Sequence, residues 1–179
     1  MVEQLTYCLK QNKPVPYSLV VASSTFQSSS IRENWKTRQV ASAGSLCEIS
    51  FRVVNLRADF RNGRIDYCAT RDKVQDINND LQTWREAMPA VWKYSTEPAP
   101  DGLDHTVFGG VIHSYSSMWV AEAWNSWRLL RILVNQLMQE NEMRAETPNT
   151  IRRLLAEAMI RHTSHDLCVS VNSFRKTPR

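Results

Sequence analysis

Apolar residues recur at steps of three and four through much of the chain after residue 45. The first series is Leu46, Ile49, Val53, Leu56 and Phe60, and it stops at Asn62-Gly63. This spacing places apolar side chains on one face of an α-helix. A second series contains Val74, Ile77, Leu81, Trp84 and Met88 and is closed by Pro89. Two such segments joined by a short turn predict an antiparallel helical hairpin.

The longest amphipathic pattern runs from Tyr115 to Glu140 and predicts a central helix. Val120 and Met138 lie at the edge of the apolar face of this helix. Trp124 lies off the centre of that face and is the residue predicted to contact another molecule. The predicted buried face consists of Trp119, Ala123, Trp127, Leu130, Val134 and Leu137. Core packing is the favoured account of the tryptophans in this helix, rather than a platform for stacking bases.

A last helix is predicted to follow Glu146. Thr147 is a suitable N-cap, and Pro148 at the first helical position loses no hydrogen bond. The pattern predicts an end near His165, where a basic side chain faces the negative end of the helix dipole. Its predicted buried stripe is Ile151, Leu154, Leu155, Ala158 and Met159.

Two segments lack helical periodicity. Residues 1–45 contain Pro14, Pro16 and a serine-rich stretch, which predict a flexible arm with one short helix between Ile31 and Ala41. Residues 89–113 predict a long connection with extended pieces around Val91 to Tyr94. The expected fold is therefore all-α: an arm at 1–45, a helical domain at 46–171 around the long central helix, and a basic tail at 172–179.

Composition and charge exclude several classes of protein. With a mean hydropathy of −0.41, the chain has no apolar run near the roughly 18 residues that a membrane span requires. The apolar run Leu19 to Ala22 is too short for a signal peptide, which predicts an intracellular protein. A net charge of +4, spread over a slightly acidic middle and basic ends, does not predict sequence-specific DNA binding.

Motifs for catalysis, cofactors or metals are weak. The sequence lacks nucleophile-elbow, phosphate-loop and dinucleotide motifs, so no enzyme activity or cofactor is predicted. Cys8, Cys47, Cys68 and Cys168 are widely spaced and read as free, mostly buried thiols. One metal alternative remains: His162, His165 and Asp166, completed by His105 or His113.

Two separated stretches resemble a known family. Residues 109–133 and the segment Asp166-Leu167-Cys168-Val169-Ser170-Val171 are similar to the fungal-specific transcription-factor domain that accompanies zinc-cluster DNA-binding domains. Asn172 stands where that family usually has proline, and the helix with Trp84 followed by Met88-Pro89 also resembles it. The residues with a place in this resemblance are Trp84, Tyr115, Trp119, Trp124, Asn125, Trp127, Arg128, Arg131, Ile132, Asp166, Cys168 and Ser170.

The resemblance implies a non-enzymatic regulatory module in the nucleus that acts in transcription regulation through protein partners or self-association. The six closely spaced cysteines of the zinc cluster are absent from this sequence, so direct DNA binding is not implied. The family's domain continues beyond the matching helices, and the chain therefore resembles an internal slice of a regulator. The residues identify no small-molecule effector. The alternatives are a small helical enzyme, a metal-binding protein and a plain protein-interaction adaptor.

Overall fold

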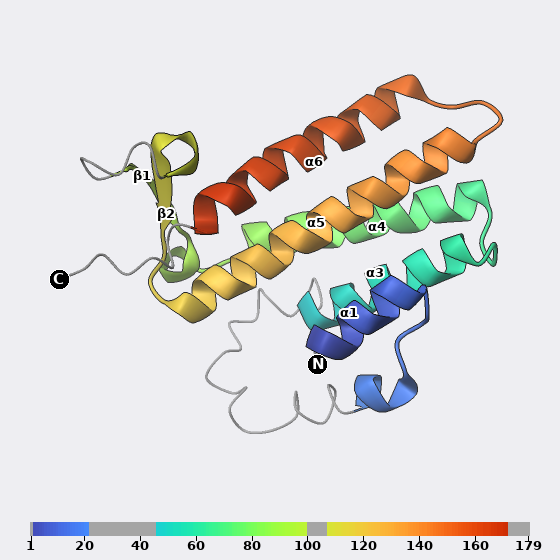
Figure 1. Ribbon diagram of the computed structural model, residues 1–179, viewed down its shortest axis with the longest axis horizontal. Coiled ribbons are helices and arrows are strands. Elements are labelled where there is room, and N and C mark those ends of the chain that lie inside the picture. The colour runs from blue at the N-terminus through green and yellow to red at the C-terminus, as the bar shows by residue number, and fades with distance from the viewer. Residues whose placement is uncertain (1, 22–45, 100–106, 172–179) are drawn as a thin grey trace.

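The computed structural model describes residues 2–21, 46–99 and 107–171, and within them the fold is all-α (Figure 1). This confirms the fold class that the apolar spacing predicts. The serine-rich stretch, the short helix predicted between 31 and 41 and the basic tail lie outside the described residues. The helices are α1 (Val2–Gln11), α3 (Leu46–Arg61), α4 (Tyr67–Glu86), α5 (Met118–Arg144) and α6 (Thr150–Val171).

The predicted hairpin is formed by α3 and α4, which pack against each other. Arg52 pairs with Asp80 across it. Gly63 ends the first helix with a φ of 66°, a left-handed conformation that glycine adopts without steric cost. Asp66 caps α4, because its carboxylate accepts a hydrogen bond from the Ala69 N–H at 2.8 Å. Both predicted stripes lie in the main core, with Leu46 half-buried at the edge.

Helix α5 crosses the middle of the molecule and contacts α3, α4 and α6 (Figure 1). Its 27 residues correspond to about 40 Å. The helix begins three residues later than predicted, because the Ser117 hydroxyl accepts a hydrogen bond from the Val120 N–H at 3.3 Å and so caps it. It continues to Arg144 rather than Glu140. Val120 and Met138, predicted at the edge, are in the core.

Helix α6 differs most from its prediction. It begins at Thr150, because the Asn149 side chain, not that of Thr147, accepts the Arg152 N–H at 2.9 Å. It passes His165 and ends at Val171. The buried positions are Ala156, Thr163, Val169 and Ser170, and the predicted stripe was wrong for Ile151, Leu154, Leu155 and Ala158, which are exposed. Burial follows the side that α5 covers, and α5 lies away from that stripe.

The connection between α4 and α5 contains a small two-stranded sheet. Strand β1 (Ser95–Pro98) pairs antiparallel with β2 (Val111–Ser114), so that Thr96 faces His113. Residues Ala90–Trp92 form a short 3-10 helix, η3, so the extended piece predicted at Val91 to Tyr94 was displaced toward the C-terminus. A second 3-10 turn, η5 (Phe108–Gly110), precedes β2 and contacts α6.

The N-terminal residues pack onto the outer side of the hairpin. Helix α1 contacts α3, and Cys8, Val15 and Leu19 form a second core cluster with Phe51 and Val54. The Val15 N–H donates to Asn55 Oδ1 at 2.7 Å. Residues 2–21 of the predicted flexible arm are therefore folded against the domain, because their apolar side chains cover the second face of α3.

The four cysteines are free thiols, as predicted, but they are not mostly buried. Cys8 is buried and Cys47 is half-buried, whereas Cys68 and Cys168 are exposed. The two exposed thiols lie on sides of α4 and α6 that no other described element covers.

Candidate functional site

A fully buried arginine organises a polar cluster where β2, α5 and α6 meet. Arg128 is 0% exposed, and its Nη1 donates to the Tyr115 hydroxyl at 2.8 Å and to Asn125 Oδ1 at 2.9 Å. Its Nη2 lies 3.2 Å from His113 Nδ1. The guanidinium also stacks over the Tyr94 ring, 4.8 Å from the centroid. Each of these partners is a neutral group, so the cluster holds a buried cation by dipoles and aromatic faces.

The last turn of α6 closes this cluster. Ser170 is 0% exposed, and its hydroxyl oxygen lies 2.7 Å from Asn125 Oδ1 and 2.6 Å from the Leu167 carbonyl. A hydroxyl has a single proton to donate, so the two acceptors share it. Asn125 Oδ1 thus receives both the α5 guanidinium and the α6 hydroxyl. This geometry ties the C-terminal end of α6 to the first half of α5.

His113 is neutral in this environment. Burial and the positive charge of Arg128 lower the pKa of His113 to about 4, from an ordinary value of 6.5. Because a guanidinium only donates, His113 Nδ1 accepts the bond from Arg128, and the ring proton of the neutral form sits on Nε2. Burial also raises the pKa of the Tyr115 hydroxyl, an effect that Arg128 opposes. At neutral pH, Arg128 therefore supplies the charge of this cluster.

The free energy of unfolding at acidic pH tests whether His113 is neutral in the folded chain. Well above pH 6.5, His113 is neutral whether the chain is folded or unfolded. As the pH falls toward 4, the unfolded chain takes up a proton that the folded chain resists, so the free energy of unfolding decreases. The expected contribution is about 2–3 kcal/mol between pH 6.5 and 4. Urea unfolding across this range should show a shallower loss for His113→Gln than for the wild type.

The exposed His162 supplies the control for this measurement. His162→Gln should retain the wild-type pH dependence, because that ring lies outside the arginine cluster. A His113→Gln curve that runs parallel to the wild-type curve would contradict the assignment.

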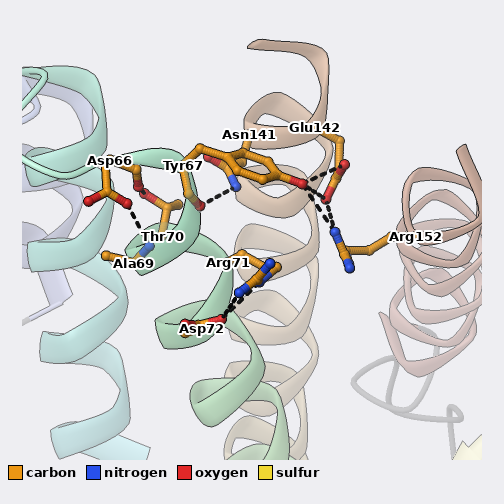
Figure 2. A network of polar contacts seen from close by, with 9 residues as sticks. All are labelled: Asp66, Tyr67, Ala69, Thr70, Arg71, Asp72, Asn141, Glu142 and Arg152. Carbon is orange, nitrogen blue, oxygen red and sulfur yellow. Dashed lines mark hydrogen bonds and ion pairs between the residues drawn. The ribbon is translucent and has the colours of Figure 1, made fainter. Parts of the chain in front are cut away.

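A second polar network joins α4, α5 and α6 at the other end of the bundle (Figure 2). The Glu142 carboxylate is 0% exposed and lies 2.6 Å from Arg152 Nη1. The Tyr67 hydroxyl donates to it at 3.0 Å, and the Asn149 N–H donates at 2.8 Å. The neighbouring Asn141 side chain donates to the Tyr67 carbonyl at 3.0 Å. All these groups fix the turn between α5 and α6 against the start of α4.

The protonation states in this network follow from its contacts. Burial by itself would raise the pKa of Glu142, but the bonds from Arg152, the Asn149 N–H and Tyr67 outweigh burial and hold that pKa below its usual range. Burial and the adjacent carboxylate raise the pKa of Tyr67. Glu142 is therefore ionised at neutral pH and the tyrosine retains its proton.

An open groove of about 480 Å³ lies between the end of α4, the segment that follows η3 and the first half of α5. Two exposed cations, Arg85 and Lys93, and the exposed Glu86 carboxylate are among the groups that line it. The Gln82 side chain donates to Glu86 at 2.6 Å. The lining residues are Gln82, Arg85, Glu86, Lys93, Tyr94 and Trp124.

The tryptophans that carried the sequence resemblance occupy both core and surface. Trp84 and Trp127 are buried, as predicted, at 4% and 7% exposure. The prediction for the other two was reversed: Trp119 is 49% exposed, whereas Trp124 is 4% exposed. Trp124 turns inward because its Nε1–H donates to the Trp92 carbonyl at 2.7 Å and its ring meets Trp84 edge-on. Trp119 sits in the first turn of α5 against the ring of Trp92.

The remaining residues of the resemblance have separate places. Arg131 is half-buried, donates to the Asn78 carbonyl at 3.2 Å and lies over the Trp127 ring. Asp166 is largely covered, and Cys168 is exposed. The structure thus brings Tyr115, Asn125, Arg128 and Ser170 into one cluster and leaves Cys168 outside it.

The metal alternative gains no support from the described residues, among which no three metal-ligating side chains come together. His162 Nε2 and His165 Nδ1 each lie 3.8 Å from an oxygen of Asp166. The His165 ring instead packs edge-on against Phe108. His113 belongs to the arginine cluster, and His105 lies outside the described residues.

Tyr67, Glu142 and Arg152 were not found from the sequence, although a signal existed. Glu142 and Arg152 lie five residues before and five residues after position 147, at the turn between two helices. In an antiparallel pair, positions equidistant from the turn lie side by side, so this acid–base pair was predictable once α5 and α6 were known to pack together. Tyr67 belongs to α4, which is distant along the chain, so no spacing in the sequence relates it to Glu142 and Arg152.

The fold and these clusters define a small all-α helical bundle with two buried polar networks. No family model matches the chain, and no match was found among curated proteins or solved structures. In the described ranges, no helix combines the length and apolar character needed to cross a membrane.

Proposed function

We propose that the chain is a non-enzymatic helical module of a fungal transcription regulator, and that it acts in the nucleus through contacts with other proteins. The observation that carries this proposal is the apolar outer face of α6. Ile151, Leu154 and Leu155 are 71%, 50% and 65% exposed, and Ala158 continues the same face. Contiguous exposed apolar side chains of this kind mark interaction surfaces.

The transcriptional context is supported by the residues of the sequence resemblance. Its two stretches are separated by more than thirty residues, yet Asn125 and Arg128 from the first meet Ser170 from the second within hydrogen-bond distance. A chance similarity of unrelated segments gives no reason for such contacts. The joint placement therefore favours one integrated domain of the kind that the resemblance implies.

A reporter assay tests this proposal. The 179-residue chain is fused to an unrelated DNA-binding domain that has no regulatory activity of its own, in a fungal cell with a reporter downstream of the cognate site. We expect reporter expression to differ severalfold from that with the DNA-binding domain alone. The double variant Leu154→Gln and Leu155→Gln should abolish the difference, because it removes the apolar contact surface.

A matched double variant controls for general loss of apolar surface. Val91→Gln and Met118→Gln alter two side chains that are 70% and 61% exposed on other elements. This variant should retain the reporter effect. A folded, nuclear fusion whose reporter level equals that of the DNA-binding domain alone would contradict the proposal.

A further inference from the structure

The open groove at the end of α4 carries more positive than negative charge. Arg85 and Lys93 line it and are exposed, and neither forms an ion pair with another described residue. Glu86 is the one acid among the described lining residues, and its carboxylate accepts a hydrogen bond from the Gln82 side chain at 2.6 Å. The described lining therefore brings two cations and one anion to the groove.

A third cation lies close to Arg85. The guanidinium carbons of Arg85 and Arg131 lie over the same Trp127 ring, at 5.7 and 5.6 Å from its centroid. Arg131 donates to the Asn78 carbonyl and pairs with no described carboxylate. Burial and the charge of Arg85 lower the pKa of Arg131, because two cations repel each other across a partly buried region. The positive charge of Arg85 is thus reinforced rather than balanced by its neighbour.

A fourth cation lies behind the aromatic part of the groove. Tyr94 and Trp124 line the groove, and the Arg128 guanidinium lies 4.8 Å from the first ring centroid and 6.0 Å from the second. Arg128 is fully buried, and its Nε has no hydrogen-bond partner among the described residues. Asp166 is an acid whose charge reaches this cluster, and it does not pair with the guanidinium. Because a buried charge is screened less than an exposed one, Arg128 adds to the positive potential of the groove.

The shape of the groove indicates the kind of ligand that it fits. Sites for small organic molecules enclose most of the ligand and are lined mainly by apolar side chains. This groove is open, and four of its six described lining residues are polar or charged. A free ion would stay hydrated there and gain little from exposed cations. A peptide can make several weak contacts at once, with acidic side chains at the cations and an apolar side chain on Tyr94 and Trp124.

We propose that this groove binds an acidic segment of a partner protein. Charge complementarity carries the proposal, because four cations lie in or beside a groove whose described lining has one acid. The contact is reversible and weakens at high salt, since exposed ion pairs are screened. The groove lies near the N-terminal end of α5, away from the exposed apolar face of α6 (Figure 1). It is a second contact surface, so the inference goes beyond the proposed function and does not depend on it.

Fluorescence anisotropy with a labelled acidic peptide tests the proposal on the purified chain. The acidic probe repeats Asp-Glu-Phe, and a neutral probe of equal length repeats Asn-Gln-Phe. We expect the acidic probe to bind in low salt and to dissociate as salt is added, and the neutral probe to bind about tenfold more weakly. Equal binding of the two probes, or no binding of the acidic probe in low salt, would overturn the proposal.

Charge variants locate the contact. Arg85→Gln and Lys93→Gln should each weaken binding of the acidic probe about two- to fivefold. Glu86→Gln should strengthen it about twofold, because it removes an acid from the groove. Lys73→Gln is the matched control: it removes an exposed cation from the same helix, outside the groove, and should leave the affinity unchanged. If it weakens binding as much as Arg85→Gln does, the peptide follows the net charge and the proposal is wrong.

Nuclear magnetic resonance separates this groove from the exposed face of α6. Titration with the unlabelled acidic peptide should shift the backbone amide signals of Lys93 and Tyr94 and leave those of Leu154 and Leu155 in place. The reverse pattern would place the peptide on α6 and overturn the proposal. Inorganic phosphate or acetate that displaces the peptide at equal concentration would assign the groove to a small anion, and this result would also overturn it.

Discussion

Replacing Trp127 with alanine is expected to lower the free energy of unfolding by about 3–5 kcal/mol. The side chain is 7% exposed and lies in the main core, with its ring edge-on to Trp124 at 5.7 Å between centroids. Its Nε1–H donates to the Leu81 carbonyl at 2.7 Å, which ties α5 to α4. Truncation would leave a large cavity and remove this bond. Urea unfolding monitored by circular dichroism measures the loss.

Two further variants make this expectation specific. Trp127→Phe retains an aromatic ring but removes the N–H donor, and we expect a smaller loss of about 1–3 kcal/mol. Trp119→Ala removes a tryptophan that is 49% exposed from the same helix, and it should cost no more than about 1 kcal/mol. If Trp127→Ala unfolds at the wild-type urea midpoint, the packing described for α4 and α5 is wrong.

Arg152→Met is expected to destabilise the fold by about 3 kcal/mol at pH 7, because it leaves the fully buried Glu142 carboxylate without its cationic partner. The effect should be smaller at pH 4. Without the arginine, only the bonds from Tyr67 and the Asn149 N–H oppose the effect of burial, so the pKa of Glu142 rises and a larger fraction of the carboxyl is protonated, and therefore uncharged, at pH 4. Urea unfolding at the two pH values separates this charge effect from a simple loss of packing.

The double variant Glu142→Leu and Arg152→Met removes both charges and should recover most of the lost stability. Arg161→Met provides a matched control, because its pair with Glu157 is solvent-exposed and also lies on α6. That control should cost less than about 0.5 kcal/mol. An equal cost for Arg152→Met at both pH values, with no recovery in the double variant, would contradict a buried ion pair.

The candidate site could be predicted only in part. The resemblance named Tyr115, Asn125, Arg128 and Ser170 as related residues, and these four lie in one cluster. It gave no reason to include His113, which enters from β2. A residue on a short strand can join a cluster of helix residues only if the sheet packs against those helices. The spacing of residues along the chain does not show where the sheet packs.

The spacing of apolar residues by itself determined α3, α4 and α5. It placed α3 and α4 with their buried stripes, because side chains three and four residues apart share one helix face whatever the neighbours are. It also placed the long α5 to within a few residues at either end.

The tertiary structure alone decided which side of an ambiguous helix is covered. Trp119 and Trp124 are both apolar candidates for burial, and only the position of Trp92 and Trp84 turns Trp124 inward. In α6, the strongest apolar stripe is exposed and Ala156 is buried instead, because α5 packs on the other side. Periodicity describes a helix about its own axis, whereas burial depends on segments that are distant along the chain.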